Sequence, residues 1–152
     1  MFLKLISSDF VRLYKNLSFV SLFSALLNPS FHACLLIRCA QCSPKYIFWL
    51  FRNILIWKHS IDFGRGCSIG SGLLLPHPIG IVFGGGTTIG CDSTIYQNVT
   101  FGKHKDGYPR IGNSCTIYGG SYVVGKITIG DNSIIGALKF VSRDITQNIT
   151  FR

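Results

Sequence analysis

Residues 111–134 read Ile-Gly-Asn-Ser-Cys-Thr, Ile-Tyr-Gly-Gly-Ser-Tyr, Val-Val-Gly-Lys-Ile-Thr and Ile-Gly-Asp-Asn-Ser-Ile. Each group of six begins with an aliphatic residue, the second residue is often glycine, and the fifth is small or aliphatic. A fixed period of six is typical of a β-solenoid, in which three short faces close a coil of about 18 residues. We therefore expect the first side chain of each hexad to point inward and to stack on its equivalent one coil away.

The same period runs from Phe63 to the hexad Val-Ser-Arg-Asp-Ile-Thr that begins at Val141. It slips by two residues between Leu75 and Phe83 and by four between Phe101 and Ile111, which predicts two loops that leave the coil. We expect the glycine at the second position to occupy a corner that needs a positive φ. A β-sandwich with glycine turns would instead show alternating strands interrupted every ~8–12 residues.

The first sixty residues have a different composition. None of the 17 glycines falls in residues 1–60, and this favours helices, where glycine is unfavourable. The predicted helices are one that begins at Ser8-Asp9 and continues through the apolar stretch 17–27, one capped by Ser30, and one over Tyr46–Trp57. The sequence thus predicts an N-terminal helical region over residues 1–60 and a solenoid domain over residues 61–152.

Charge and composition exclude several classes of protein. The 152 residues are 47% hydrophobic and 14% charged, which excludes intrinsic disorder. The net charge of +9 favours anionic partners, but the basic residues are spread singly, so we do not expect nucleic-acid binding. The uncharged stretch 17–37 holds Asn28, Pro29, His32 and four serines, and is therefore a poor candidate for a membrane span; contact of this stretch with a membrane surface is kept as a minor alternative.

Six cysteines include the pair Cys39-Ala-Gln-Cys42, but neither a second ligand pair for zinc nor a βαβ context for redox chemistry accompanies it. We therefore expect the cysteines to be small buried hydrophobic residues, in a protein of the reducing cytoplasm.

Three stretches of the solenoid resemble the serine acetyltransferase family of hexapeptide-repeat acyltransferases: residues 60–84, 95–102 and 109–113. The run Phe31-His32-Ala33, followed by Arg38, is a weaker match to the helical part of that family. The resemblance implies a left-handed parallel β-helix, an exception to the usual right-handed crossover. It also implies acetyl-CoA as the donor, no metal, and a homotrimer or a dimer of trimers with active sites between subunits.

A histidine lies in the first slip of the repeat, within Leu75-Pro76-His77-Pro78, where two prolines stiffen the backbone. The resemblance implies that His77 is the general base and that Asp62, fifteen residues earlier, orients its imidazole. Acetyl transfer to a hydroxyl needs such a base, and a carboxylate on the other ring nitrogen fixes the tautomer. We expect His32 and His59 to be structural.

The resemblance also implies roles for the second loop and for the later coils. In the loop, the candidates for acceptor binding are His104, Asp106, Tyr108 and Arg110. The candidates for CoA binding, chosen because phosphates need cationic or N–H partners, are Gly119, Lys126, Gly136, Lys139 and Arg143.

The resemblance implies an O-acetyltransferase that acts on L-serine in cysteine biosynthesis. Members of the family commonly carry an Arg-His pair before the proline of the second loop, where this chain has Gly107-Tyr108. This difference keeps a sugar hydroxyl, as in capsule or lipopolysaccharide O-antigen biosynthesis, as an alternative acceptor. The sequence after Gly136 also departs from the family and stops at Arg152, so an inactive, truncated solenoid is a third hypothesis.

Overall fold

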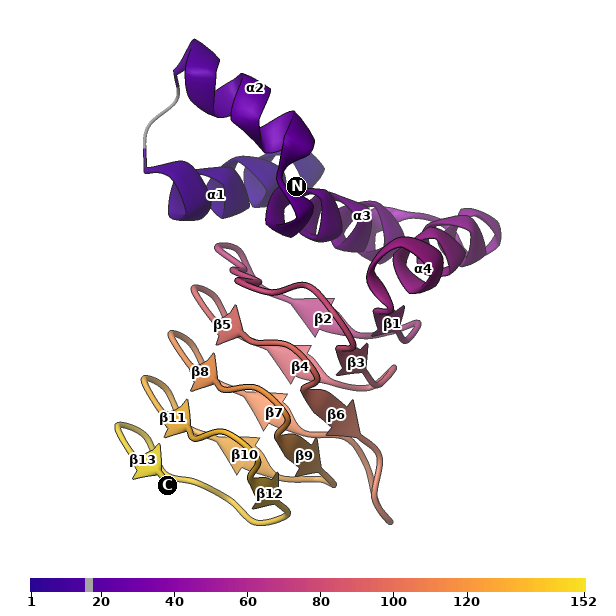
Figure 1. The fold of residues 1–152 in the computed structure, drawn as a ribbon. Helices are drawn as coiled ribbons and strands as arrows, with labels where there is room; N and C mark the ends of the chain where they lie inside the picture. The colour runs from indigo at the N-terminus through magenta and orange to yellow at the C-terminus, as the bar shows by residue number, and fades with distance from the viewer. Residues whose placement is uncertain (16–17) are drawn as a thin grey trace.

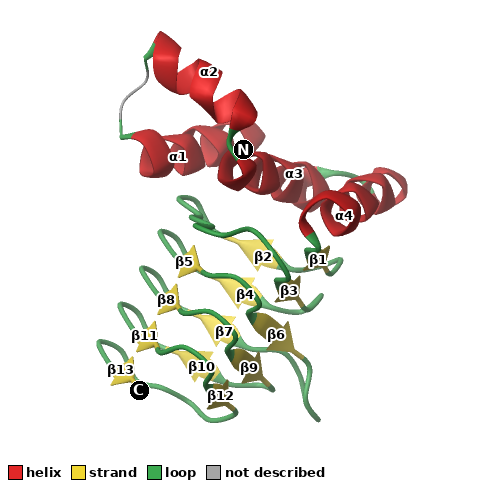
Figure 2. Ribbon diagram, in the orientation of Figure 1, coloured by secondary structure: helices red, strands yellow, loops and turns green. Residues whose placement is uncertain are grey.

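A computed structural model describes residues 1–15 and 18–152, and in it four helices lie across one end of a stack of short strands (Figure 1, Figure 2). The C-terminus lies at the far end of this stack (Figure 1). The helices are α1 Phe2–Tyr14, α2 Phe19–Leu27, α3 Pro29–Cys42 and α4 Lys45–His59.

The strands form three sheets, and every pairing between neighbouring strands is parallel. The first sheet contains β1 Asp62–Phe63, β3 Val82–Phe83, β6 Thr100–Gly102, β9 Tyr122–Val124 and β12 Phe140–Val141. The second contains β2 Ser68–Ile69, β4 Thr88–Ile89, β7 Arg110–Ile111 and β10 Thr128–Ile129. The third contains β5 Thr94–Ile95, β8 Thr116–Ile117, β11 Ile134–Ile135 and β13 Thr150–Phe151. Each sheet is one face of a left-handed parallel β-helix, which confirms the predicted fold class.

The first residue of each hexad is buried and stacks on its equivalent in the next coil, as the period predicts. The rings of Phe63 and Phe83 lie 5.9 Å apart, and those of Phe83 and Phe101 lie 5.6 Å apart. The fifth positions of the regular hexads from Cys67 to Ser133 are buried as well, whereas Lys139 in the hexad that begins at Ile135 is only partly buried. Where the fifth residue is a serine, its hydroxyl donates to a backbone carbonyl of the next coil. The Ser121 hydroxyl, for example, donates to the carbonyl of Gly136 at 2.7 Å.

The prediction for the second-position glycines is wrong. Positive φ values fall at the fourth position of the hexads instead, for example at Gly66 and Asn132. The second-position glycines lie where two coils approach closely. A Cβ on Gly64 would stand 2.4 Å from the backbone nitrogen of Gly85 in the next coil, and one on Gly70 would stand 2.7 Å from that of Cys91.

Both predicted loops are present, because Phe63 pairs with Phe83 and Phe101 pairs with Val123. The hexad assigned to Val141 does not continue regularly, since the next inward residue is Ile145, which pairs with Ile129. The Asp144 carboxylate accepts the Thr128 N–H at 2.7 Å, and this contact accompanies the shortened corner.

The helices differ from the prediction in their boundaries. Ser8 and Asp9 lie inside α1, which begins at Phe2. A second helix, α2, follows after residues 16 and 17, which are outside the described residues. Asn28 rather than Ser30 caps α3, because its side-chain oxygen accepts the N–H of Ser30 at 2.9 Å. The predicted helix over Tyr46–Trp57 is confirmed as α4.

A buried ion pair fastens the helices to the first coil. Arg38 of α3 donates to both carboxylate oxygens of Asp9 in α1, at 2.8 and 2.9 Å. The same guanidinium donates to the carbonyls of Ile69 and Gly70, and Asp9 accepts the N–H of Leu73. One charged cluster therefore holds α1, α3 and the first coil in a fixed arrangement.

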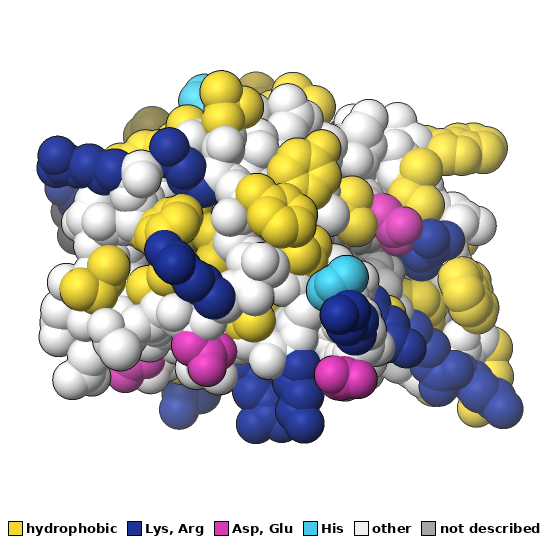
Figure 3. Space-filling view, turned by 90° about the horizontal axis from the view of Figure 1, so that it is seen from below, with side chains coloured by type: hydrophobic (Ala, Val, Ile, Leu, Met, Phe, Trp, Pro, Cys, Tyr) yellow, Lys and Arg dark blue, Asp and Glu magenta, His cyan; other side chains and the backbone are white. Residues whose placement is uncertain are grey.

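The distribution of basic side chains, the state of the cysteines and the length of the helices bear on the expectations drawn from composition. Seen from the C-terminal end of the stack, basic side chains are scattered over the face and do not form one patch (Figure 3). All six cysteines are free thiols, and Cys34, Cys67 and Cys115 are buried as expected, whereas Cys42 is exposed. Within residues 1–15 and 18–152, every helix is too short or too polar to cross a membrane.

Candidate active site

The loop that carries His77 is anchored to the helices on both sides. Before it, the Ser30 hydroxyl of α3 donates to the carbonyl of Leu75. After it, the N–H of Gly80 donates to the carbonyl of His59, the last residue of α4, at 3.4 Å. The loop is thus held between the starts and ends of helices that are distant in the sequence.

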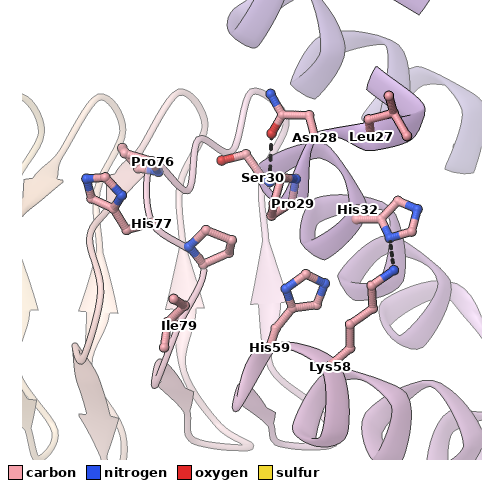
Figure 4. A pocket seen from close by; sticks show the side chains of 11 residues that line it. Leu27, Asn28, Pro29, Ser30, His32, Lys58, His59, Pro76, His77 and Ile79 are labelled. Carbon is pink, nitrogen blue, oxygen red and sulfur yellow. Dashed lines mark hydrogen bonds between the residues drawn. The ribbon is translucent and has the colours of Figure 1, made fainter. Parts of the chain in front are cut away.

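Between this loop and the helices lies a cavity of about 650 Å³ (Figure 4). Its walls come from the end of α2, the start of α3, the end of α4 and the loop itself. The lining residues are Leu27, Asn28, Pro29, Ser30, His32, Lys58, His59, Pro76, His77, Pro78 and Ile79. A cavity of this size is in the range that binds small organic molecules.

Two tyrosines on the neighbouring coils accompany His77. The imidazole centroid lies 6.3 Å from the ring of Tyr96, which in turn stacks on Tyr118 at 4.8 Å. Both tyrosines occupy the second position of a hexad, where glycine is usual. This departure from the repeat is the feature of the sequence that could have indicated an aromatic surface here. The two tyrosine rings therefore form an aromatic surface beside His77, which the sequence analysis does not predict.

Asp62 is engaged by a residue of α4. Arg52 Nε donates to Asp62 Oδ1 at 2.9 Å, and Nη2 of the same arginine lies 2.8 Å from that oxygen. In the described part of the chain no hydrogen bond joins Asp62 to His77. Both arginine contacts fall on Oδ1, however, and a carboxylate has a second oxygen that can accept a hydrogen bond. The pairing of Asp62 with His77 therefore stays a prediction.

The candidates for acceptor binding lie in the second loop, outside the lining of the cavity. His104 and Gly107 exchange backbone hydrogen bonds at 3.2 and 3.3 Å, which folds the loop into a tight hairpin that carries Asp106. The Tyr108 ring packs over Gly84 and Gly86, where a Cβ would stand 2.5 and 2.3 Å from it. Arg110 begins β7 and is exposed.

The candidates for CoA binding are spread along the later coils. Gly119 lies against Gln97, and the stem of Lys126 lies beside Gly107 of the second loop. Lys139 lies near Gly136, and the Arg143 guanidinium stands 5.7 Å from the Phe151 ring. The single chain brings none of these described residues into the cavity of His77.

His32 and His59, which the sequence predicts to be structural, both line the cavity. His59 is buried, and this burial, aided by Lys58 and His32, lowers the pKa of its imidazole. Lys58 Nζ lies 2.5 Å from Nδ1 of His32 (Figure 4). Although three histidines line the cavity, no group of His, Cys, Asp or Glu among the described residues is arranged to hold a metal ion.

Comparisons with known proteins identify relatives that share both sequence and fold. A family model described as bacterial transferase hexapeptide (six repeats) matches residues 108–142. The serine acetyltransferase of Helicobacter pylori is 36% identical over 133 residues, which cover 82% of this chain and 78% of that protein.

Two solved structures show the same similarity over nearly the whole chain. The crystal structure of serine acetyltransferase isoform 3 from Entamoeba histolytica, in complex with cysteine, matches with a TM-score of 0.86 and 26% identity, and covers 99% of this chain. That of the Neisseria gonorrhoeae enzyme in complex with serine matches with a TM-score of 0.83 and 27% identity, and covers 98%. This chain spans 58% and 65% of the lengths of those two proteins. On this sequence identity and coverage, the chain belongs to the serine acetyltransferase family of hexapeptide-repeat transferases.

Proposed function

We propose that this chain is an acyltransferase that moves the acetyl group of acetyl-CoA to the hydroxyl of L-serine, the first chemical step toward cysteine. The observation that carries this proposal is the placement of His77. It stands on a proline-stiffened loop, held at both ends by the helices, at the edge of a cavity of suitable size. Family membership supplies the donor and the acceptor.

In the proposed reaction, neutral His77 accepts the proton of the serine hydroxyl as its oxygen attacks the thioester carbonyl. The C–O bond of the ester forms, the C–S bond breaks, and the CoA thiolate takes the proton back from the imidazolium. A base in this position accelerates such a reaction by ~10²–10⁴-fold. We propose that Asp62, through its second carboxylate oxygen, orients the imidazole and stabilises the imidazolium.

We propose a homotrimer as the active form. In the single chain the second loop and the later coils lie apart from the cavity of His77. A neighbouring copy would supply His104, Asp106, Tyr108 and Arg110 for the acceptor. It would also supply the CoA-binding candidates, namely Gly119, Lys126, Gly136, Lys139 and Arg143. We further propose that the protein works in the reducing cytoplasm, because even the exposed Cys42 is unpaired.

The test is turnover of the purified protein, followed by loss of thioester absorbance so that the protein's own thiols do not interfere. We expect saturable consumption of acetyl-CoA with L-serine, and we expect the His77→Ala variant to fold normally and to lose at least ~100-fold in turnover. Full activity of His77→Ala would contradict the role of the histidine. Turnover with sugar acceptors but none with L-serine would contradict the choice of acceptor.

A further inference from the structure

The wall of the cavity opposite His77 contains a buried histidine with an unused polar atom. His59 is 6% exposed and lines the cavity, and in Figure 4 its ring lies between the His77 loop and the His32–Lys58 pair. Among the described residues, no atom is hydrogen-bonded to His59 Nε2. A buried N–H without an acceptor is unfavourable, and a ligand that offers an acceptor oxygen at this point would relieve that penalty.

The surroundings of His59 favour a negatively charged acceptor. Lys58 brings a positive charge to the same wall, and its contact with His32 Nδ1 uses one of its three N–H donors. The N-terminus of α3, at Asn28 to Ser30, also opens on the cavity, and a helix N-terminus carries a partial positive charge. Among the described residues that line the cavity, none is an aspartate or a glutamate.

We propose that His59 and Lys58 bind the carboxylate of the amino-acid acceptor, with Nε2–H of His59 as the hydrogen-bond donor and Lys58 as the countercharge. The inference rests on the proposed function and assigns part of the acceptor site to the end of α4. A carboxylate held on this side leaves the rest of a small amino acid directed toward His77, which stands on the other side of His59 from Lys58 (Figure 4).

The number of charges distinguishes a carboxylate from the phosphates of CoA. Of the described lining residues, only Lys58 is a permanent cation, which matches a single carboxylate, whereas a pyrophosphate is usually held by several cations or N–H groups. In the second loop, Gly107 and Tyr108, which precede Pro109, carry no positive charge that could bind this carboxylate.

The closing experiment measures binding rather than turnover. Calorimetry compares the binding of L-serine, of L-serinamide, which lacks the negative charge, and of acetyl-CoA to the wild type and to the variants Lys58→Met, His59→Leu and His59→Gln. Lys45→Met, at the exposed start of the same helix, is the matched control for loss of one positive charge. We expect about tenfold weaker binding of L-serine to Lys58→Met and His59→Leu, the effect of losing one charge-assisted hydrogen bond.

The controls are expected to stay unchanged. Lys45→Met should bind L-serine as the wild type does, and His59→Gln, which keeps an N–H donor, should recover most of the affinity lost in His59→Leu. L-Serinamide should bind the wild type and Lys58→Met equally. Because Lys58 is exposed, Lys58→Met tests the inference even if replacing the buried His59 prevents folding.

Three results would overturn the inference: undiminished binding of L-serine to Lys58→Met and His59→Leu, no binding of L-serine to the wild type, or a loss of acetyl-CoA affinity in place of serine affinity. Failure of the proposed function is seen separately in the turnover assay. A wild type that binds L-serine through Lys58 but consumes no acetyl-CoA would support the binding wall and contradict the reaction.

Discussion

Replacing Asp9 by asparagine removes the charge that neutralises a completely buried arginine. The side chain of Arg38 is 0% exposed and that of Asp9 is 2% exposed. In the wild type the guanidinium donates to both carboxylate oxygens and to two backbone carbonyls of the first coil. Asparagine has the same shape, but it offers one acceptor oxygen and places an NH₂ group against a cation.

The structure indicates a large loss of stability for Asp9→Asn. Removing one partner of a buried ion pair destabilises a protein by about 3–5 kcal/mol, since the remaining charge is left without compensation. We expect about 3 kcal/mol, the lower end, because the asparagine oxygen still accepts one hydrogen bond. For a chain of this length that loss corresponds to a fall in Tm of about 6–12 °C.

The assay is guanidinium unfolding followed by circular dichroism at one fixed protein concentration, which keeps any contribution of oligomerisation constant. Asp92→Asn is the matched control, because Asp92 pairs with Arg12 at 3.3 Å across side chains that are 56% and 29% exposed. Asparagine also tolerates the positive φ of residue 92. An exposed pair contributes about 0–1 kcal/mol, so this control should unfold close to the wild type.

The reasoning is refuted if Asp9→Asn loses no more stability than Asp92→Asn. A second variant separates charge from shape: in Asp9→Leu combined with Arg38→Met, neither partner is left as an unpaired buried charge. Asp9→Leu alone leaves the buried charge of Arg38 without compensation, so the double variant should be more stable than Asp9→Leu alone.

Three further predictions follow from the packing of the coils and from the thiols. Gly64→Ala should lower the free energy of unfolding by about 1–3 kcal/mol, because its Cβ would stand 2.4 Å from the backbone of Gly85; Gly107→Ala, whose Cβ would meet its nearest atom at 3.4 Å, should unfold like the wild type. Burial raises the pKa of the Cys67 thiol from 9.0 to about 12, so the unfolded chain loses this proton first and the free energy of unfolding should fall as the pH rises above about 9. Chemical denaturation across this pH range should show a smaller fall in Cys67→Ala, and an equal fall would contradict the assignment. In the native protein a thiol reagent should modify the exposed Cys42 rapidly and Cys67 only after unfolding, which mass spectrometry of the labelled peptides would detect.

The repeat of six predicted the fold because the residues that point into the coil recur at the same positions of each hexad. An aliphatic or phenylalanine side chain at the first position and a small one at the fifth fill the interior of a narrow coil, and both sets are buried as expected. The two slips of the period also became loops, since a change of register leaves extra residues outside the coil.

Features that depend on contact between coils could not be read from one hexad. Gly64 looked like a residue chosen for a positive φ, whereas its surroundings show that the next coil leaves no space for a side chain. The register change between Val141 and Ile145 was missed for the same reason, because only the pairing of Ile145 with Ile129 reveals it.

The cavity is the part that periodicity was least able to predict, because it belongs to the junction of the two regions. His77 was found from its local motif, but His59 was treated as structural, since nothing in a glycine-free helical stretch points to a binding wall. The contacts that create the cavity join residues that are far apart in the sequence. The Ser30 hydroxyl donates to the carbonyl of Leu75, and the carbonyl of His59 accepts the N–H of Gly80. Both ends of the loop are therefore hydrogen-bonded to helices, one end to α3 and the other to α4. A shift of α3 against α4 would consequently move His77 relative to Lys58 and His59, which we propose bind the carboxylate of its substrate.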